Sequence, residues 1–224
     1  MSVAFGILHT HYSFFIIHSQ FMSNMSTPKL PLPFAGAQGA ISEKTLSIHH
    51  DKLYAGYVDK KDEIGEKLKA LSHGGDIASA NQSYSELRAL KDGETFAING
   101  VYLHEWYFAN LGGDGHATEA VAKALTDKYG SMENFLAYFA ACGMAARGWV
   151  VLAWDTHDKA LRIYNGDAHN QGGVWGAIPL LVMDVYEHAY FMDFGSDRKA
   201  YIQDFLAHVN WQTVEERFIA TQNV

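Results

Sequence analysis

The chain has 224 residues, 48% of them hydrophobic and 19% charged, which is enough for one large or two small domains with buried cores. Its 17 Lys and Arg against 25 Asp and Glu give a formal charge of −8, which argues against broad nucleic-acid binding because that needs a basic face. A single cysteine, Cys142, excludes an intramolecular disulfide framework, whereas twelve histidines offer many metal ligands and proton carriers.

The first 26 residues differ in composition from the rest of the chain. They have an apolar centre with no Lys or Arg ahead of it, and three histidines interrupt the apolar run. A secretory signal has a positive leading segment and a membrane helix needs about 20 apolar residues, so neither is predicted. We interpret residues 1–26 as an extension with little structural role, upstream of an alternative start at Met22 or Met25; a poorly formed targeting peptide is the other interpretation. We therefore expect a cytoplasmic protein that does not bind membranes.

Residues 27–112 are predicted to form a helical hairpin domain. After a proline-rich segment, Ser42 is a good N-cap for a first helix over residues 42–71. One face of this helix holds four residues at helical spacing: Leu46, His49, Leu53 and Tyr57. A second helix is predicted over residues 94–111, and its His104 is surrounded by aromatic residues.

Residues 113–224 are predicted to form a second domain that mixes helices and strands. A glycine-rich segment, residues 112–115, separates it from the hairpin. Helical periodicity and β-branched runs then predict the following elements: helices over 117–130 and 131–146, strands over 148–155, 160–166 and 177–184, and helices over 197–209 and 211–220. The predicted fold class is α+β, with an N-terminal helical hairpin followed by an α/β domain containing a small three-stranded antiparallel sheet.

Four residues from these elements form a candidate metal site. They are His49 and His104 on the two hairpin helices, and Asp184 and His188 after the third strand. Three imidazoles and one carboxylate suit a redox-capable ion such as Mn or Fe, although zinc accepts the same ligand types. A single histidine on an apolar helix face is more often a hydrogen-bonded core residue, and an Asp and a His four positions apart often arise by chance. Periodicity and ligand type alone leave both interpretations open.

Several segments resemble the iron/manganese superoxide dismutases. "DVYEHAYF" resembles the family signature "DVWEHAYY", with "IPLL" just upstream, and "LHEWYFANLGG" resembles the family's second helix. "ISEKTLSIHHDKLYAGYV" resembles the first helix, and "GWVVL" and "VNWQTVEERF" match later segments. The resemblance covers roughly residues 28–218 in the same order. It implies superoxide as the substrate, conversion to dioxygen and hydrogen peroxide, and one Mn or Fe ion per chain held by His49, His104, Asp184 and His188.

The resemblance also implies roles for residues around the metal. Tyr57 matches the family's tyrosine at the mouth of the substrate channel. His169 replaces the glutamine that usually hydrogen-bonds the solvent at the metal, with Gln171 as the alternative. Gly100 occupies the place of that glutamine in iron types, as it does in manganese types. These differences leave the choice between Mn and Fe open.

Further matches concern the subunit interface and substrate attraction. Glu187 matches a glutamate that reaches the partner subunit's ligand histidine, which implies a homodimer or a tetramer. Arg198 matches an arginine near the channel, and Tyr186 replaces the signature Trp beside the site. The usual His and Tyr pair at the interface is replaced by Leu53 and Phe191, so we expect a coherent apolar variant whose effect on the proton relay is open.

Two other functions are carried as alternatives. The first is a metal-binding relative with different redox chemistry, which the Leu53 and Phe191 change would favour. The second is a catalytically weak interaction protein, which the full set of four ligands disfavours.

Overall fold

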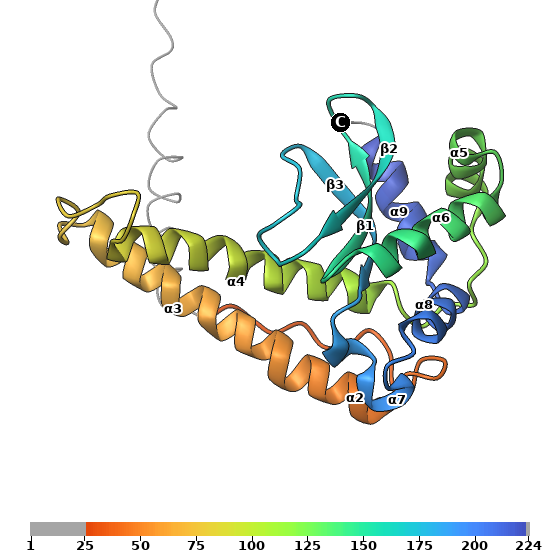
Figure 1. Ribbon diagram of the computed structural model, residues 1–224, viewed down its shortest axis with the longest axis horizontal. Helices are drawn as coiled ribbons and strands as arrows, with labels where there is room; N and C mark the ends of the chain where they lie inside the picture. The colour runs from red at the N-terminus through yellow and green to blue at the C-terminus, as the bar shows by residue number, and fades with distance from the viewer. Residues whose placement is uncertain (1–25, 223–224) are drawn as a thin grey trace, which may run out of the picture.

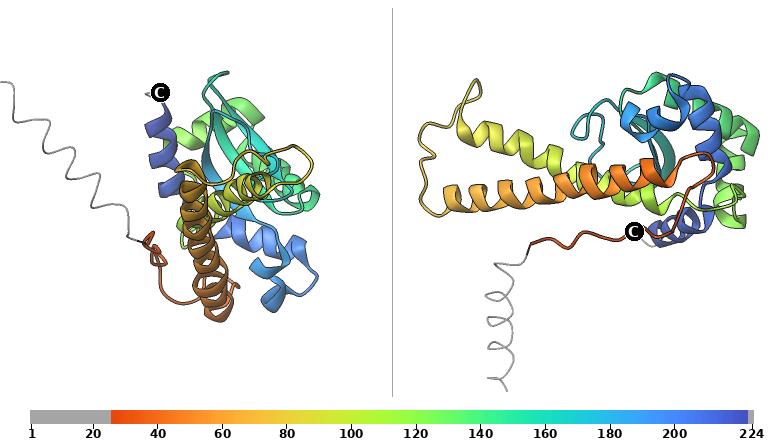
Figure 2. Two further views of the ribbon diagram at one scale, coloured as in Figure 1. Left: turned by 90° about the vertical axis from the view of Figure 1, so that its left-hand side faces the viewer. Right: turned by 90° about the horizontal axis from the view of Figure 1, so that it is seen from below.

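Two long antiparallel helices, α3 (Ala55–Ser72) and α4 (Glu86–Ala109), form an arm at one end of the molecule (Figures 1 and 2). This architecture comes from a computed structural model that describes residues 26–222. Except for its last residue, the predicted extension 1–26 therefore lies outside the described residues. The helical hairpin predicted for the N-terminal half is confirmed.

The first hairpin helix contains a wider turn that the sequence did not predict. It runs through α2 (Glu43–Ile48), a π-helical segment η1 (His49–Tyr54) and then α3. The predicted N-cap is confirmed, because Ser42 Oγ accepts a hydrogen bond from the Thr45 N–H. In η1 the backbone hydrogen bonds join residues five positions apart, and such turns are frequent at functional sites. The regular helix predicted over residues 42–71 is therefore wrong at this segment.

The second hairpin helix begins earlier than predicted. α4 starts at Glu86, whereas periodicity placed its beginning at residue 94. Ser85 caps it, with its hydroxyl accepting from the Arg88 N–H at 3.2 Å. Leu87 and Leu90 lie at helical spacing in the first two turns, and Ser85 is a favourable N-cap, so the sequence carries a signal for this earlier start that the prediction did not use.

The three predicted strands form one antiparallel sheet. They are β1 (Trp149–Asp155), β2 (Ala160–Gly166) and β3 (Ala177–Asp184), in the order β2-β1-β3. The central strand β1 pairs with both neighbours and is mostly buried, which fits its apolar sequence. Its pairing with β3 places Trp149 opposite Asp184. The register therefore delivers the last residue of β3 to the start of the central strand.

Helices gather beside the sheet on the side away from the tip of the arm (Figure 1). They are α5 (Glu119–Tyr129), α6 (Met132–Ala145), α8 (Arg198–Ala207) and α9 (Trp211–Thr221). Two short turns between β3 and α8 were not predicted: the 3-10 helix η2 (Glu187–Ala189) and α7 (Phe191–Phe194). Elements this short have too little periodicity to be found from sequence.

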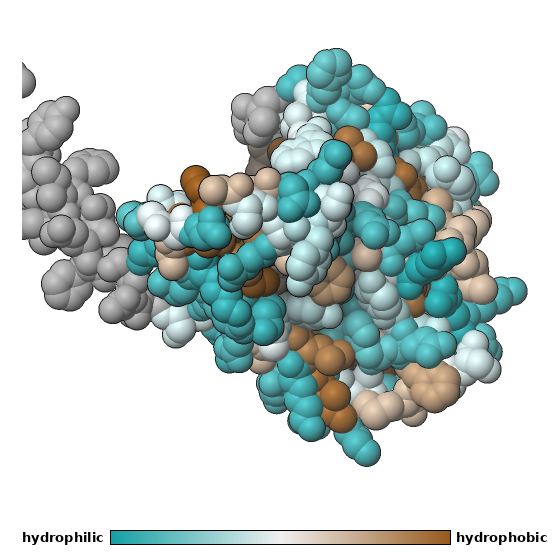
Figure 3. All heavy atoms as spheres, turned by 60° about the vertical axis from the view of Figure 1, so that its left-hand side comes forward, coloured by the Kyte–Doolittle hydropathy of each residue, from teal (hydrophilic) through white to brown (hydrophobic). Residues whose placement is uncertain are grey.

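A single hydrophobic core joins the two halves of the chain. It includes Val101 and Tyr107 of α4, Leu181 of β3 and Phe205 of α8, all fully buried. The boundary predicted near residue 112 stays a prediction. The face seen with the arm forward is mainly hydrophilic, with apolar side chains in small separate groups (Figure 3). Within residues 26–222, no helix has both the length and the apolarity needed to cross a membrane.

Candidate metal centre

Four side chains from separate elements converge where the arm meets the sheet. They come from the start of η1, the C-terminal part of α4, the last position of β3 and the turn η2. One potential ligand atom from each lies within 4.8 Å of all the others; the residues are His49, His104, Asp184 and His188. The first three are fully buried, and His188 has 29% of its side chain exposed. The residues that the sequence proposed as a group are thus adjacent in space.

The carboxylate of Asp184 is the centre of this cluster. Its Oδ2 lies 3.2 Å from Nε2 of His49 and 3.2 Å from Nε2 of His188. Its Oδ1 accepts the Tyr186 N–H at 2.8 Å, and its backbone carbonyl accepts the Tyr201 hydroxyl at 2.6 Å. The first bond orients the carboxylate, and the second holds the backbone that carries it.

The local charges keep Asp184 ionised. Burial opposes its charge, but the charge of His188, the hydrogen bond with His188 and the proximity of His49 outweigh it and hold the pKa of Asp184 well below its ordinary value. Burial also opposes the charged form of His188, yet Asp184 raises the pKa of this histidine overall. Asp184 therefore carries a negative charge at neutral pH.

The two deeply buried histidines are neutral. Burial lowers the pKa of His49 although its contact with Asp184 opposes this, and burial together with the charge of His49 lowers the pKa of His104 well below its ordinary value. Nδ1 of His104 lies 2.5 Å from the Gly100 carbonyl oxygen. A carbonyl can only accept, so Nδ1 carries the hydrogen and Nε2 keeps a free lone pair.

The buried ring nitrogens that have no hydrogen-bond partner fit a metal ion. Both ring nitrogens of His49 and Nε2 of His104 are buried without a hydrogen-bond partner in the described chain. Although His49 Nε2 lies close to Asp184, the angle does not make a hydrogen bond. Buried polar nitrogens are costly to leave unpaired, and a cation would bind one nitrogen of each ring together with the carboxylate. Three neutral imidazoles and one carboxylate form a donor set suited to a first-row metal.

A further histidine lies beside the cluster, and its tautomer is set by a tryptophan. The indole N–H of Trp149 donates to Nδ1 of His169 at 2.9 Å, so the hydrogen of this imidazole must sit on Nε2. Burial lowers the pKa of His169 to about 4, which keeps the ring neutral at pH 7. Its ring centroid lies 5.8 Å from His104 and 4.7 Å from Tyr57. His169 is therefore held as a hydrogen-bond donor.

Comparison with known proteins identifies the family. The family model for the α-hairpin domain of iron/manganese superoxide dismutases matches residues 24–112, and that for their C-terminal domain matches residues 117–217. The chain belongs to this family. It is 43% identical over 180 residues to "Superoxide dismutase [Fe]" of Aquifex pyrophilus, covering 80% of this chain and 84% of the relative. It is 34% identical over 200 residues to "Superoxide dismutase [Mn] 1" of Halobacterium salinarum, covering 88% and 96%.

Two other predicted residues lie beside the cluster of this superoxide dismutase. The Tyr57 ring lies 5.3 Å from the ring of His104, and burial followed by the charge of Asp184 raises the pKa of Tyr57. The Tyr186 ring stacks on His188 at 5.3 Å. Between the two candidates on the β2–β3 loop, His169 is buried near the cluster and Gln171 is exposed.

The remaining predicted residues lie outside the cluster. Arg198 donates from Nε to the Tyr190 hydroxyl at 3.2 Å and from Nη1 to the Ala146 carbonyl at 2.9 Å, so its described contacts do not include the four clustered side chains. Glu187 is exposed. Leu53 is partly buried and Phe191 is 53% exposed.

Sequence reasoning missed the role of Trp149. "GWVVL" was interpreted only as a strand and a family match. The signal available was a tryptophan at the start of a buried strand, since a buried indole N–H usually finds an acceptor. The identity of that acceptor depends on the β2–β3 loop and could not be found locally.

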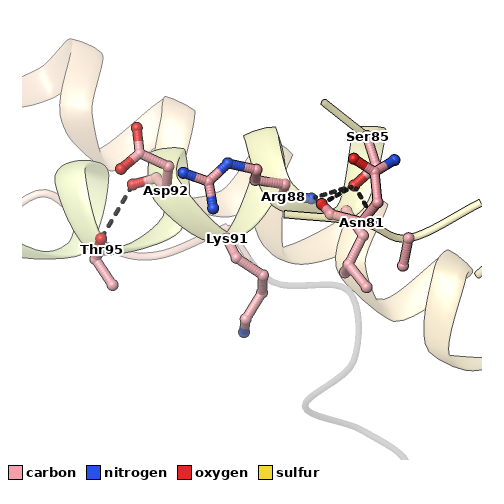
Figure 4. Close-up of a pocket in the computed structure, with 8 residues that line it drawn as sticks. Asn81, Ser85, Arg88, Lys91, Asp92 and Thr95 are labelled. Carbon is pink, nitrogen blue, oxygen red and sulfur yellow. Dashed lines mark hydrogen bonds between the residues drawn. The ribbon is translucent and has the colours of Figure 1, made fainter. Parts of the chain in front are cut away.

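A separate surface pocket of about 590 Å³ lies along the first half of α4 and the segment before it. Its polar groups bond to one another, with Ser85 Oγ accepting from the Arg88 N–H and Thr95 Oγ1 donating to the Asp92 carbonyl (Figure 4). The residues around it are Ala80, Asn81, Ser85, Leu87, Arg88, Lys91, Asp92 and Thr95. None belongs to the histidine cluster, so this pocket is not the metal centre.

Proposed function

We propose that this protein converts superoxide to dioxygen and hydrogen peroxide with one Fe or Mn ion held by His49, His104, Asp184 and His188. The observation that carries the proposal is the convergence of these four donors within 4.8 Å in a chain of the superoxide dismutase family. Relatives named for iron and for manganese match the chain, so the proposal leaves the metal open.

Three of the four ligand residues have a protonation state that their surroundings fix. The ion, when bound, supplies one-electron redox chemistry by alternating between its +3 and +2 states. His49 and His104 offer neutral nitrogens, because burial lowers the pKa of both. Asp184 offers a full negative charge, which stabilises the cation without a net charge from the imidazoles.

Proton supply falls to two residues beside the cluster. Forming hydrogen peroxide from superoxide consumes two protons, so the site needs hydrogen-bond donors that keep their hydrogen at neutral pH. Tyr57 meets this requirement because burial raises the pKa of its hydroxyl, and His169 meets it because Trp149 occupies its Nδ1. We assign these two residues to orienting substrate and solvent and to proton delivery.

The partly exposed side of the centre supports a dimer. Glu187 is exposed next to His188, and its side chain makes no hydrogen bond or ion pair within residues 26–222. Phe191 and Met192, which begin the next short helix, α7, are 53% and 50% exposed. We assign this surface to the interface of a homodimer, in which the partner's glutamate would orient His188. Pairing of dimers into tetramers and the cytoplasmic location stay predictions from the sequence.

The decisive experiment is superoxide consumption by the purified protein, expressed per atom of Fe and per atom of Mn from elemental analysis. A fast rate tied to one metal supports the proposal and identifies the cofactor. Stoichiometric metal with negligible turnover would contradict it and favour different redox chemistry at the same four ligands.

A further inference from the structure

The loop that joins β2 to β3 carries His169 and is held by contacts from several elements. Besides the Trp149 bond to His169, the Asn170 side chain donates to Asp92 on α4, with Nδ2 3.1 Å from Oδ1. Asp92 and Thr95, which line the pocket of Figure 4, thus support this loop from the arm. The imidazole of His169 is placed by the loop as a whole.

Tyr186 connects this loop to the cluster. Its backbone N–H donates to Asp184, and its ring stacks on His188 with planes 17° apart. The same ring lies 5.6 Å from the ring of His169. Its hydroxyl donates to the Asp167 carbonyl at 3.3 Å, two residues before His169. One residue therefore contacts two ligand residues and the loop, Asp184 through its backbone and His188 through its ring.

The surroundings of Tyr186 leave it little freedom. A Cβ atom at Gly148 would lie 2.8 Å from the Tyr186 ring, so the ring fits closely against the backbone at the start of β1. The Arg147 N–H, one residue earlier, donates to Oδ1 of Asp167 at 3.2 Å. Asp167 is thus held through both its carbonyl and its carboxylate, and the two bonds place the start of the loop.

We propose that Tyr186 is a positioning residue that sets the placement of His169 through its hydroxyl bond to the Asp167 carbonyl. The inference rests on the proposed function only in that His169 is taken to act at the metal centre. The Trp of the family signature has no hydroxyl at this position, so this bond is a property of the Tyr. Through this hydroxyl bond, the position of the β2–β3 loop depends on the segment that carries Asp184 and His188.

The test uses the full-length protein loaded with Zn²⁺, a diamagnetic ion that accepts the same ligand types. Two quantities are compared between wild type and Tyr186→Phe, which keeps the ring and removes the hydroxyl. The first is amide hydrogen exchange over residues 167–171, and the second is the ¹H–¹⁵N signal of the Trp149 indole, assigned with Trp149→Phe. Tyr164→Phe is the matched control, because it removes a hydroxyl bonded to Asp155 at the sheet.

Tyr186→Phe is expected to speed exchange in the loop about fivefold, as the loss of one ordinary hydrogen bond implies. It is also expected to move the Trp149 indole signal toward that of an indole without an acceptor, and Tyr164→Phe is expected to do neither. Asp167→Ala, which removes the other anchor of the loop, should reproduce both changes. Unchanged exchange, or faster exchange with an unmoved indole signal, would overturn the proposal. Absence of superoxide activity in wild type would refute the proposed function and leave both readouts interpretable.

Discussion

Gly100 lies where α4 passes the Tyr57 ring. Replacing it with alanine has two opposing effects on the free energy of unfolding, and the size of each can be stated. Alanine in a helix interior is favoured over glycine by about 0.8–1 kcal/mol. A Cβ atom at Gly100, however, would lie 2.8 Å from Cγ and 2.9 Å from Cδ1 of Tyr57. Cγ is the root of the ring, so it cannot swing away without moving the side chain or helix, and overpacking of this kind costs about 1–3 kcal/mol.

We expect Gly100→Ala to be destabilised by about 0–2 kcal/mol. The matched control is Gly65→Ala in α3, where a Cβ would meet nothing within 4 Å and the full gain of about 1 kcal/mol should appear. For a chain of this length each kcal/mol shifts the unfolding temperature by about 2–4 °C, so a gap of about 2 kcal/mol separates the variants by about 4–8 °C.

The assay is thermal unfolding at equal metal content, because a bound ion adds to the apparent stability. Superoxide turnover is measured on the same samples and should fall only in Gly100→Ala, since its Tyr57 ring is displaced. If Gly100→Ala were stabilised as much as Gly65→Ala and kept full turnover, the argument that glycine makes room for Tyr57 would be refuted.

Four further predictions follow from the described contacts. His104→Ala should lose most of its Fe or Mn by elemental analysis, and retained metal would contradict the ligand assignment. Trp149→Phe should keep its metal but lose about 10- to 100-fold in turnover, because His169 loses the indole N–H that orients its ring. Full turnover in this variant would contradict the role given to the bond between Trp149 and His169. Burial opposes the charge of Asp193, but hydrogen bonds from Thr45 and Ser42 outweigh it and lower its pKa, so this stabilisation is fully present above the ordinary pKa of about 4 and is lost as pH falls through the lowered folded-state pKa. Urea unfolding should show Asp193→Asn about 0.5 kcal/mol less stable than wild type at pH 7, after allowing for solvent screening, and the difference should shrink as pH falls below about 4; parallel curves would exclude the effect. Glu187→Ala should weaken dimer association in sedimentation, whereas an unchanged monomer–dimer balance would remove its role at the interface.

The elements of the α/β half were predictable because their signals are local. β2 and β3 begin and end where runs of β-branched and aromatic residues do, and Ser42 caps the first helix as its residue type indicates. The start of α4 was missed although Ser85, Leu87 and Leu90 mark it, and the π turn at His49 was not predictable, because residues 46–57 show the apolar spacing of an ordinary helix. At η1, hydrogen bonds five residues apart reduce the rotation per residue, and this keeps Tyr57 near the face that carries His49.

The sequence by itself determined the donor types, their order along the chain and the elements that carry them, since these follow from residue chemistry and short-range spacing. Only the tertiary structure decided which atoms face one another. The pairing of β1 with β3 sets Trp149 opposite Asp184, and the indole bond to His169 selects its tautomer. The hydroxyl of Tyr186 reaches a loop carbonyl nineteen positions earlier in the chain. Such contacts join residues far apart in sequence, so they depend on strand register and core packing, which no local pattern encodes.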